Sequence, residues 1–322
     1  LSERQKYEID RFLFQGGSVF MAVQNYEFDY KPEETGIVTL VPKEKSPAVN
    51  DLLSAWGFQV DPRILADEQS EAITLSGGGR GALLGLSFPV KTPIQILLTD
   101  SEINSETSIT ARLPAFFYLW GSALKIDSKK TGEQGLKLKT LFHSTQRSWM
   151  VPFKPGNLTP EAFDRTATSP AGPFPLAVLA EGQFANAYQG KQAPEWSEDP
   201  AASQFPQENK KEETSASLKP GPGKLLLIGA ATPFQKQLMQ NGAHLNFFLN
   251  AVDILTLGDA LIGIRAKGQA GRLLPKVSAP AKMAWRIFVM FLMPVLIALL
   301  GLGRAYMRRR TKQLYLKGLN VS

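Results

Sequence analysis

The chain of 322 residues contains no cysteine and only two histidines, His143 and His244. Without cysteine there is no disulfide, no thiolate metal site and no thiol nucleophile. Two histidines do not suffice for a histidine-rich metal centre. An extracytoplasmic location stays compatible with this composition, although the lack of disulfides does not demand it.

Long apolar runs are also scarce, and the chain has one, from Ile287 to Gly303, without a charged residue. A bilayer core requires about 20 mostly apolar helical residues, and residues 283–307 supply that length. Trp285 would lie at the interface, and Arg286 and Arg304 would extend toward the head groups. The alternative is a buried helix of a soluble domain. A basic tail, rather than more domain, follows the run, so it predicts a transmembrane helix.

The charges beside the run predict its orientation, because Lys and Arg are retained on the cytoplasmic side. Four basic residues precede the run within a short distance: Arg272, Lys276, Lys282 and Arg286. Six follow it: Arg304, Arg308, Arg309, Arg310, Lys312 and Lys317. We therefore expect a bacterial inner-membrane protein with a cytoplasmic tail over 308–322 and its main domain in the periplasm.

The net charge of +7 is unevenly distributed. No acidic residue follows Asp259, and the segment after it holds 12 of the 36 Lys and Arg residues. The first 259 residues hold 24 basic and 29 acidic residues, a net charge of −5. The positive charge therefore predicts contact with anionic lipid and no nucleic-acid partner.

The beginning of the chain has the pattern of half a βαβ unit. Ser2 and Gln5 form a capping box, and Ile9, Phe12 and Leu13 form an apolar stripe. Gly16 and Gly17 would end this helix, and the apolar run 18–23 is typical of a parallel strand covered on both faces. Because there is neither an initiator Met nor an export signal, we also expect polypeptide upstream of Leu1.

Strands and helices alternate through the rest of the body. Ser46 and Pro47 predict a helix start, and Gly57 would end that helix before a strand at 58–60. Its apolar residues are Val49, Leu52, Leu53 and Trp56. Further strands are expected at 94–99, at 136–142 as an edge strand, at 175–180 and at 224–229. The core face of the last helix would consist of Leu245, Phe248, Leu249, Val252 and Leu255.

This alternation predicts an α/β, Rossmann-like layered domain with a largely parallel sheet, followed by one C-terminal transmembrane helix. Residues 1–190 and 224–267 would form the domain. Residues 191–223, rich in Pro, Glu, Lys, Ser and Gln, would be a flexible insertion. Residues 268–282 would be a juxtamembrane linker.

Two glycine-containing turns are candidate phosphate sites. The stretch from Ser76 to Gly81 lacks the Gly-Lys-Ser/Thr ending of a phosphate loop. The turn from Gly229 to Phe234 lacks the G-x-G-x-x-G fingerprint. We therefore expect no nucleotide and no other cofactor.

Enzyme chemistry has few candidates. Asp100 and Glu102 follow a buried strand, where two carboxylates could act as acid and base or hold a cation. No histidine or third ligand lies nearby in the sequence, so a solvated turn is the favoured interpretation. His143 with Ser144 and Ser148 lacks a nucleophile elbow. The sequence predicts no catalytic residues, and a membrane-tethered hydrolase using the two carboxylates stays as an alternative.

The aromatic stretch 116–120 is a candidate ligand or partner surface. Phe117, Tyr118 and Trp120 could contact an envelope protein or a polysaccharide, which makes a glycan-binding module a second alternative. In the alternative interpretation, the same aromatic residues pack in the core beneath a loop.

An ordered series of blocks resembles the GldG family, auxiliary components of ABC-type transport systems first associated with gliding motility. The blocks are 2–10 with 16–20, 49–53 with Gly57 and 64–67, PFPLAVLAEGQF at 173–184, GKLLLIGAATPF at 223–234, and 246–250 with Asp253, Ile264 and Arg265. The chain has Ala230 and Ala231 where the family usually has an acidic residue, which puts a ligand role of that turn in doubt.

The resemblance implies a periplasmic domain related to intraflagellar-transport and oligosaccharyltransferase-subunit domains, between two transmembrane helices. This chain would be the C-terminal part. It further implies a permease and its ATPase subunit as partners, a non-enzymatic scaffolding role, and no catalytic residues.

Overall fold

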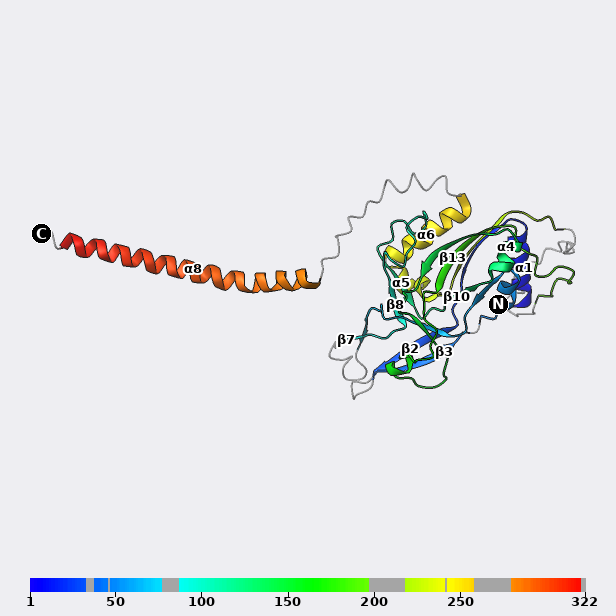
Figure 1. Cartoon of the computed structure of the whole chain (residues 1–322), viewed down its shortest axis with the longest axis horizontal. Coiled ribbons are helices and arrows are strands. Elements are labelled where there is room, and N and C mark those ends of the chain that lie inside the picture. The colour runs from blue at the N-terminus through cyan, green and yellow to red at the C-terminus, as the bar shows by residue number, and fades with distance from the viewer. Residues whose placement is uncertain are drawn as a thin grey trace, which may run out of the picture. The chain divides into compact units, whose positions relative to one another are not determined.

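The computed structural model describes residues 1–32, 38–45, 47–76, 87–196, 218–240, 242–257 and 279–319 (Figure 1). The chain divides into two compact units, Leu1–Gln269 and Ala270–Ser322. The glycine-rich stretch from Ser76 to Gly81 lies almost wholly outside the described residues, since only Ser76 belongs to them.

A four-stranded sheet forms the centre of the first unit, with the order β1-β14-β13-β11. The strands are β1 (Ser18–Ala22), β14 (Gly223–Ile228), β13 (Pro175–Gly182) and β11 (Lys137–His143). β1 and β14 are parallel, whereas β13 is antiparallel to both of its neighbours. The prediction of a largely parallel, Rossmann-like sheet was therefore wrong, and the fold is a mixed α/β one. An apolar run predicts a buried strand but contains no information about its direction.

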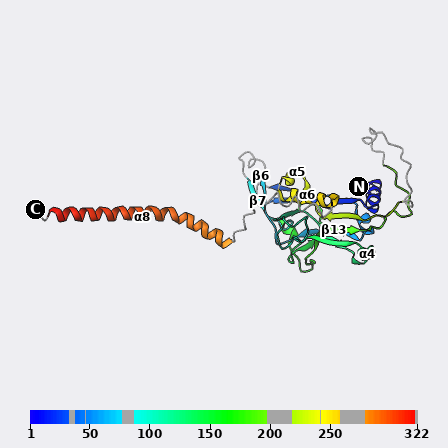
Figure 2. The ribbon, with the colours of Figure 1, turned by 90° about the horizontal axis from the view of Figure 1, so that it is seen from above.

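Both faces of this sheet are covered by apolar side chains. Leu226, Ile228 and Leu179 face α6 (Gly242–Leu257), and the residues between them face α1 (Glu3–Phe14) and α2 (Asn50–Ala55). Figure 2 shows α6 on one side of β13 and α4 (Ser128–Glu133) on the other. The period of two along each strand thus produces two cores, one on each face.

The first helix begins as predicted and buries a different stripe. The Ser2 and Gln5 capping box is present in full. Leu13 is buried, but Phe12 is 55% exposed, so its predicted place in the core was wrong. Tyr7 is buried instead, and it packs edge-on against Tyr188.

The second predicted helix is shorter than its sequence signals indicate. It begins at Asn50 rather than at Pro47, and Ser46 lies outside the described residues. Gly57 follows it with φ of +87°, a backbone conformation that favours glycine, and β4 (Phe58–Val60) comes next, as predicted. The four predicted apolar residues of this helix are all buried: Val49, Leu52, Leu53 and Trp56.

The buried face of α6 is rotated from the predicted one. Leu245 and Leu249 are each 39% exposed, while His244, Phe247 and Ala251 are fully buried. Leu255 alone of the predicted residues is buried, and Phe248 and Val252 are half-buried. Apolar residues surround this helix on most sides, so periodicity does not select the face that packs.

In the described ranges, five two-stranded sheets accompany the central one. They pair β2 (Tyr26–Pro32) with β3 (Val38–Glu44), β4 with β10 (Leu124–Ile126), β5 (Ile64–Ala66) with β12 (Trp149–Val151), β6 (Ile73–Ser76) with β7 (Ser87–Val90), and β8 (Gln95–Leu98) with β9 (Phe116–Leu119). Short helical segments complete the described elements: η1 (Pro160–Phe163), η4 (Thr232–Phe234) and α5 (Lys236–Met239). The predicted edge position of β11 is confirmed by the strand order.

The ends of the predicted flexible insertion pack on the domain. The Arg4 guanidinium donates a hydrogen bond of 3.0 Å to the carbonyl of Pro194, and it lies 5.1 Å from the centre of the Trp196 ring. Leu218 is buried. Residues 197–217 of the insertion lie outside the described part of the chain.

The second unit contains α8 (Ala279–Leu319), with Pro294 inside it. Within this helix, the 22 residues Phe288–Arg309 have a mean hydropathy of 2.1, and none of the side chains described there is buried. By length and composition it is a candidate membrane span. The helix also includes residues 279–282 of the predicted linker and most of the predicted tail, whereas 268–278 lie outside the described residues.

Candidate functional site

The carboxyl ends of the parallel strands β1 and β14 are where α/β folds usually place ligands. Gln24, which follows β1, fills this position with its own side chain. Its Oε1 accepts hydrogen bonds from the backbone N–H groups of Ala231, at 2.8 Å, and Thr232, at 2.7 Å. Its Nε2 donates to the Thr232 hydroxyl and to the Tyr26 carbonyl, each at 2.7 Å. The N–H groups that an anion would need are thus occupied by an amide.

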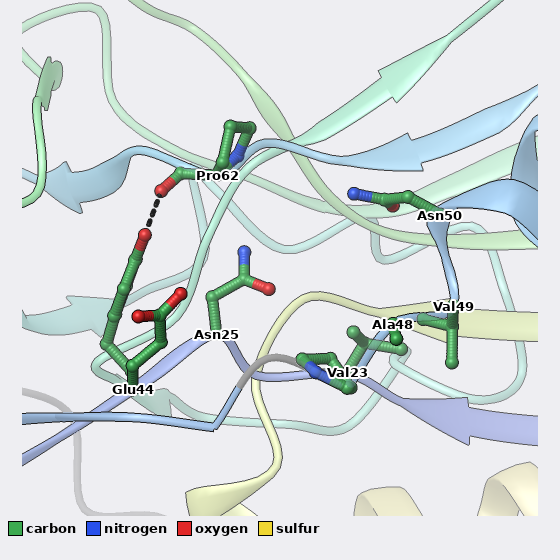
Figure 3. A pocket seen from close by; sticks show the side chains of 9 residues that line it. Val23, Asn25, Glu44, Ala48, Val49, Asn50 and Pro62 are labelled. Carbon is green, nitrogen blue, oxygen red and sulfur yellow. Dashed lines mark hydrogen bonds between the residues drawn. The ribbon is translucent and has the colours of Figure 1, made fainter. Parts of the chain in front are cut away.

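A small pocket lies beside this turn and has a volume of about 190 Å³ (Figure 3). It is formed by the residues that follow β1, the end of β3 and the start of α2. Its lining residues are Val23, Asn25, Tyr26, Glu44, Pro47, Ala48, Val49, Asn50 and Pro62. Ala48 has φ of +49°, which is uncommon for a residue with a side chain and often accompanies a functional site.

Two amides hold the pocket walls in place. Asn50 donates to the Val60 carbonyl at 2.9 Å and accepts from the Val60 N–H at 2.8 Å, which ties the start of α2 to β4. Asn25 donates to the Asp61 carbonyl at 2.9 Å and to the Ser122 hydroxyl at 3.3 Å. These amide N–H groups are therefore committed to the fold.

The remaining polar groups of the pocket are a phenol and a carboxylate. The Tyr26 hydroxyl donates to the Pro62 carbonyl at 2.7 Å, the hydrogen bond drawn in Figure 3. Burial raises the pKa of Tyr26, and the carboxylates of Glu44 and Asp61 raise it further. The phenol thus stays protonated, and Glu44 is the single charged residue of the lining. This chemistry suits the binding of a small group rather than a reaction.

The two predicted carboxylates have different surroundings. Asp100 is exposed, whereas Glu102 is only 5% exposed. Oε2 of Glu102 accepts from Gln69 Nε2 at 2.8 Å, from the Thr99 N–H at 3.0 Å and from the Thr99 hydroxyl at 2.9 Å. Oε1 accepts from the Ser101 hydroxyl at 2.6 Å.

The pKa of Glu102 reflects these bonds. Burial alone would raise it, but the hydrogen bonds from Ser101, Thr99 and Gln69 together lower it. Glu102 therefore holds a turn together and does not present an acid to a substrate. Among the described residues, no group of three or more acidic or histidine side chains could hold a metal ion.

His143, the last residue of β11, is followed by a turn that contains the buried residues Ser144 and Ser148. Ser144 Oγ accepts from the Phe174 N–H at 2.8 Å and lies 2.7 Å from Ser148 Oγ, which in turn donates to the Thr145 carbonyl at 2.8 Å. His143 Nδ1 lies 3.0 Å from the carbonyl oxygen of Ser144. Both hydroxyls are fully buried, which is unsuited to a nucleophile.

The predicted aromatic surface is divided between core and periphery. Tyr118 is completely buried and donates to the Ser122 carbonyl at 2.6 Å, and burial raises its pKa well above the usual value. This burial agrees with packing in the core, the alternative to a ligand surface. Trp120 stacks on Tyr30 with ring centres 6.0 Å apart and donates to its hydroxyl at 3.1 Å. Phe117 is half-buried.

His244 joins α6 to β9. Nδ1 lies 3.0 Å from the Leu238 carbonyl oxygen, and Nε2 lies 3.2 Å from both the N–H and the carbonyl oxygen of Phe117. A neutral imidazole with its proton on Nδ1 donates to Leu238 and accepts from the Phe117 N–H. Burial lowers the pKa of His244 by more than its backbone hydrogen bonds raise it.

The predicted residues of the membrane anchor all lie in α8. Trp285 is 63% exposed and packs edge-on against Phe288, with 5.6 Å between ring centres. Arg304, Arg308 and Arg309 are exposed. Arg286 and Arg310 belong to the same helix, and their side chains lie outside the described part of the structure.

Sequence reasoning missed Gln24 and the pocket residues Asn25, Glu44 and Asn50. One signal could have found two of them, because Gln24 and Asn25 directly follow the apolar run of β1. Polar residues at the carboxyl end of a buried strand are candidates for a site. Glu44 ends β3 and Asn50 begins α2. No local sequence pattern indicates that these two elements pack beside the end of β1.

Comparisons with known proteins point to transport. The family model described as "ABC-type uncharacterized transport system" matches residues 1–252. A solved structure, "mmIFT52 N-terminal domain", is similar with 14% identity and a TM-score of 0.40, over 80% of this chain and 73% of that chain. A search of curated proteins finds no match. The family model covers most of the chain, and the chain therefore belongs to this ABC-type transport system family as an auxiliary component.

Proposed function

We propose that this chain is a non-enzymatic accessory subunit of an ABC-type transporter and that α8 anchors it in the bacterial inner membrane. The observation that carries the proposal is that one chain joins a domain of this transport family, at residues 1–252, to a candidate span at Phe288–Arg309. An exposed apolar helix of this length is costly in water and stable in lipid.

The orientation follows from the charges at the two ends of this helix. Arg304, Arg308 and Arg309 follow the apolar stretch, and basic residues are retained in the cytoplasm. The C-terminus would therefore be cytoplasmic, and the first unit would be periplasmic. Anionic lipid would bind the basic end.

The domain would act by binding rather than by catalysis. Glu102 is saturated with hydrogen bonds, and the hydroxyls of Ser144 and Ser148 are buried. A membrane-tethered hydrolase consequently has less support than a scaffold, and so does a glycan-binding surface that includes the buried Tyr118. The partners would be a permease and its ATPase subunit, with an envelope protein or polysaccharide as a further partner.

The finer identity in this proposal is a GldG-like subunit of the kind associated with gliding motility. Its support is the ordered series of sequence blocks, which extends into the described elements β13, β14 and α6. The scaffold would couple its periplasmic domain to the permease through α8.

Affinity purification of the full chain from gently solubilised membranes tests this function. We expect recovery of an ATPase and a multispan permease in constant proportion to the chain. A matched variant of the 322-residue chain that lacks residues 287–303, expressed without any upstream membrane helix, should appear in the soluble fraction and recover neither partner. Recovery of the full chain alone, under conditions that keep other ABC complexes intact, would contradict the proposal.

A further inference from the structure

The two edges of the central sheet differ in how they are protected. At one edge, β11 exposes Lys137 and Lys139, and its pairing with β13 shifts register twice near Phe142. The backbone of Glu102 and Asn104 also bonds to its end, through the His143 N–H and the Leu141 carbonyl. Charged side chains, irregular pairing and a covering loop are the usual means of preventing a further strand from pairing.

At the other edge, formed by β1, the described part of the chain shows none of these means. Its sequence from Ser18 to Ala22 contains no charge and no proline, and its register with β14 is regular along all five pairs. In the part of the chain that the structure describes, β14 is the one strand that pairs with β1. An open, regular and apolar edge is a template for another strand.

The backbone groups of this edge can be assigned from the pairing. The Gly17 carbonyl accepts from Lys224 at 3.1 Å and the Val23 N–H donates to Ile228 at 2.9 Å, so the odd-numbered residues of this stretch point toward β14. Alternate residues of a strand direct their N–H and C=O groups to opposite sides. Ser18, Phe20 and Ala22 therefore direct theirs to the open side.

Apolar side chains on both helical layers lie close to this edge. On one face, Phe20 of β1 packs edge-on against Phe248 of α6, at 5.5 Å, and Leu245 and Leu249 of the same helix are each 39% exposed. On the other face, Phe12 of α1 is 55% exposed and lies directly against Gly17. Both layers thus offer apolar surface that a further strand would cover.

The direction of α1 shows how such a strand would be connected. Its first turns lie beside α2, where Lys6 pairs with Asp51 at 2.9 Å, and the start of α2 lines the pocket at the carboxyl end of β1. Its last turn meets Gly17, at the amino end of β1. α1 therefore runs antiparallel to β1, as does a helix that connects two parallel strands.

We propose that the open edge of β1 is the docking site of one further strand, parallel to β1 and formed by the polypeptide segment that leads into α1. It would bond to the outward groups of Ser18, Phe20 and Ala22. Because helices cover both faces, the segment would be uncharged and almost continuously apolar over about five residues. The sheet would then extend in the parallel direction, independently of the proposed role in transport.

Single cysteines test this proposal, because the chain has none of its own. Phe12→Cys and Leu249→Cys place thiols on the two layers beside β1, and Lys137→Cys is the matched control on the protected edge. Maleimide labelling is compared between the 322-residue chain and the same chain extended by its native upstream polypeptide. We expect the extension to slow labelling at positions 12 and 249 by about tenfold, with position 137 unchanged.

Ser18→Pro separates strand pairing from general stabilisation. It removes an N–H on the open side and leaves the bonds to β14, and proline is tolerated at the first residue of a strand. In the extended chain, Ser18→Pro should restore fast labelling, whereas Ser18→Ala should not. Equal labelling with and without the extension would overturn the proposal. Protection of positions 12 and 249 that depends on protein concentration would indicate a second copy of the chain at the edge of β1. Protection that requires a co-expressed permease would indicate the permease there. Either result would overturn the proposal.

Discussion

Gln24 and Thr232, which are 208 residues apart in sequence, are joined by two hydrogen bonds of 2.7 Å each. They lie at the carboxyl ends of β1 and β14, the two parallel strands of the central sheet. The side chain of Gln24 thus occupies the position in which many α/β proteins bind an anion. A binding role for this domain has to use another surface.

Replacing Gln24 should therefore destabilise the fold rather than open a site. Gln24→Ala would leave the N–H groups of Ala231 and Thr232 without an acceptor, at a cost of about 2 to 4 kcal/mol. Thermal unfolding of the full chain in detergent measures this loss. Gln235→Ala is the matched control, because Gln235 is exposed and its bond to Glu27 lies at the surface; an equal loss in both variants would refute the assignment.

Gly229, at the end of β14, should tolerate no side chain. A Cβ there would lie 2.2 Å from the Ser122 carbonyl oxygen and 2.6 Å from the Tyr118 hydroxyl. We expect Gly229→Ala to lower the free energy of unfolding by about 2 kcal/mol or more, as overpacking does in other cores. In Gly132→Ala, by contrast, the new methyl group would meet no atom within 4 Å, and stability should hold or increase. Chemical denaturation of both variants provides the comparison.

His244 should make the fold sensitive to mild acid. Burial lowers its pKa below the ordinary 6.5, so below that pH the unfolded chain takes up a proton that the folded chain resists. The contribution of neutral His244 to the free energy of unfolding is then fully present above pH 6.5. It declines as the pH falls toward the folded pKa, by up to about 1.4 kcal/mol per pH unit.

The histidine variants separate this effect from other titrations. His244→Gln, whose amide can still donate to Leu238 and accept from Phe117, should flatten the decline. His143→Gln should retain it. Denaturant melts between pH 5 and pH 8 measure both slopes, and a decline that follows His143 instead would show that the wrong histidine was assigned.

Glu102 should matter for stability and Asp100 should not. Glu102→Gln replaces an acceptor oxygen by an NH₂ group that faces donors, which should cost about 1 to 3 kcal/mol. Since hydrogen bonds hold the pKa of Glu102 below the ordinary 4.5, its contribution is complete above that pH and is lost as the pH falls through the folded pKa. Asp100→Asn should leave both stability and partner recovery unchanged. Loss of biological activity in Asp100→Asn, with the fold and partner recovery intact, would favour the hydrolase alternative.

The arginines after the apolar stretch should determine the orientation of α8. Replacing Arg304, Arg308, Arg309 and Arg310 by Ser removes the excess of basic residues on the C-terminal side, so a mixture of orientations is expected. Labelling of a single cysteine at Ser322 with a membrane-impermeant maleimide, in spheroplasts, reads the outcome. Serine at Arg272 and Lys276 is the control, and it should leave position 322 inaccessible.

Much of the fold could be predicted from local patterns. The capping box at Ser2, the helix end at Gly57 and the edge position of β11 each depend on neighbouring residues or on side-chain alternation, and all are present. The direction of β13 and the buried face of α6 could not be predicted. Both depend on which distant element packs against them, and an apolar run is compatible with more than one answer.

The candidate site was even less accessible to prediction. Asp100 and Glu102 are close in sequence, but one is exposed and the other is enclosed by Gln69, Thr99 and Ser101. The structural role of Gln24 depends on its hydrogen bond with Thr232, and no local sequence pattern connects the two residues. Hydrogen-bond satisfaction is a property of the folded state, so residue types alone do not distinguish a catalytic group from a structural one.

The amino-acid sequence by itself determined the apolar length of the C-terminal helix, the basic charge after it and the absence of thiol chemistry, because these depend only on composition along the chain. The tertiary structure decided which carboxylates are enclosed, where Gln24 is placed and which edge of the sheet is open. Those properties arise when segments hundreds of residues apart come into contact, and burial and hydrogen bonding then assign each polar group its role.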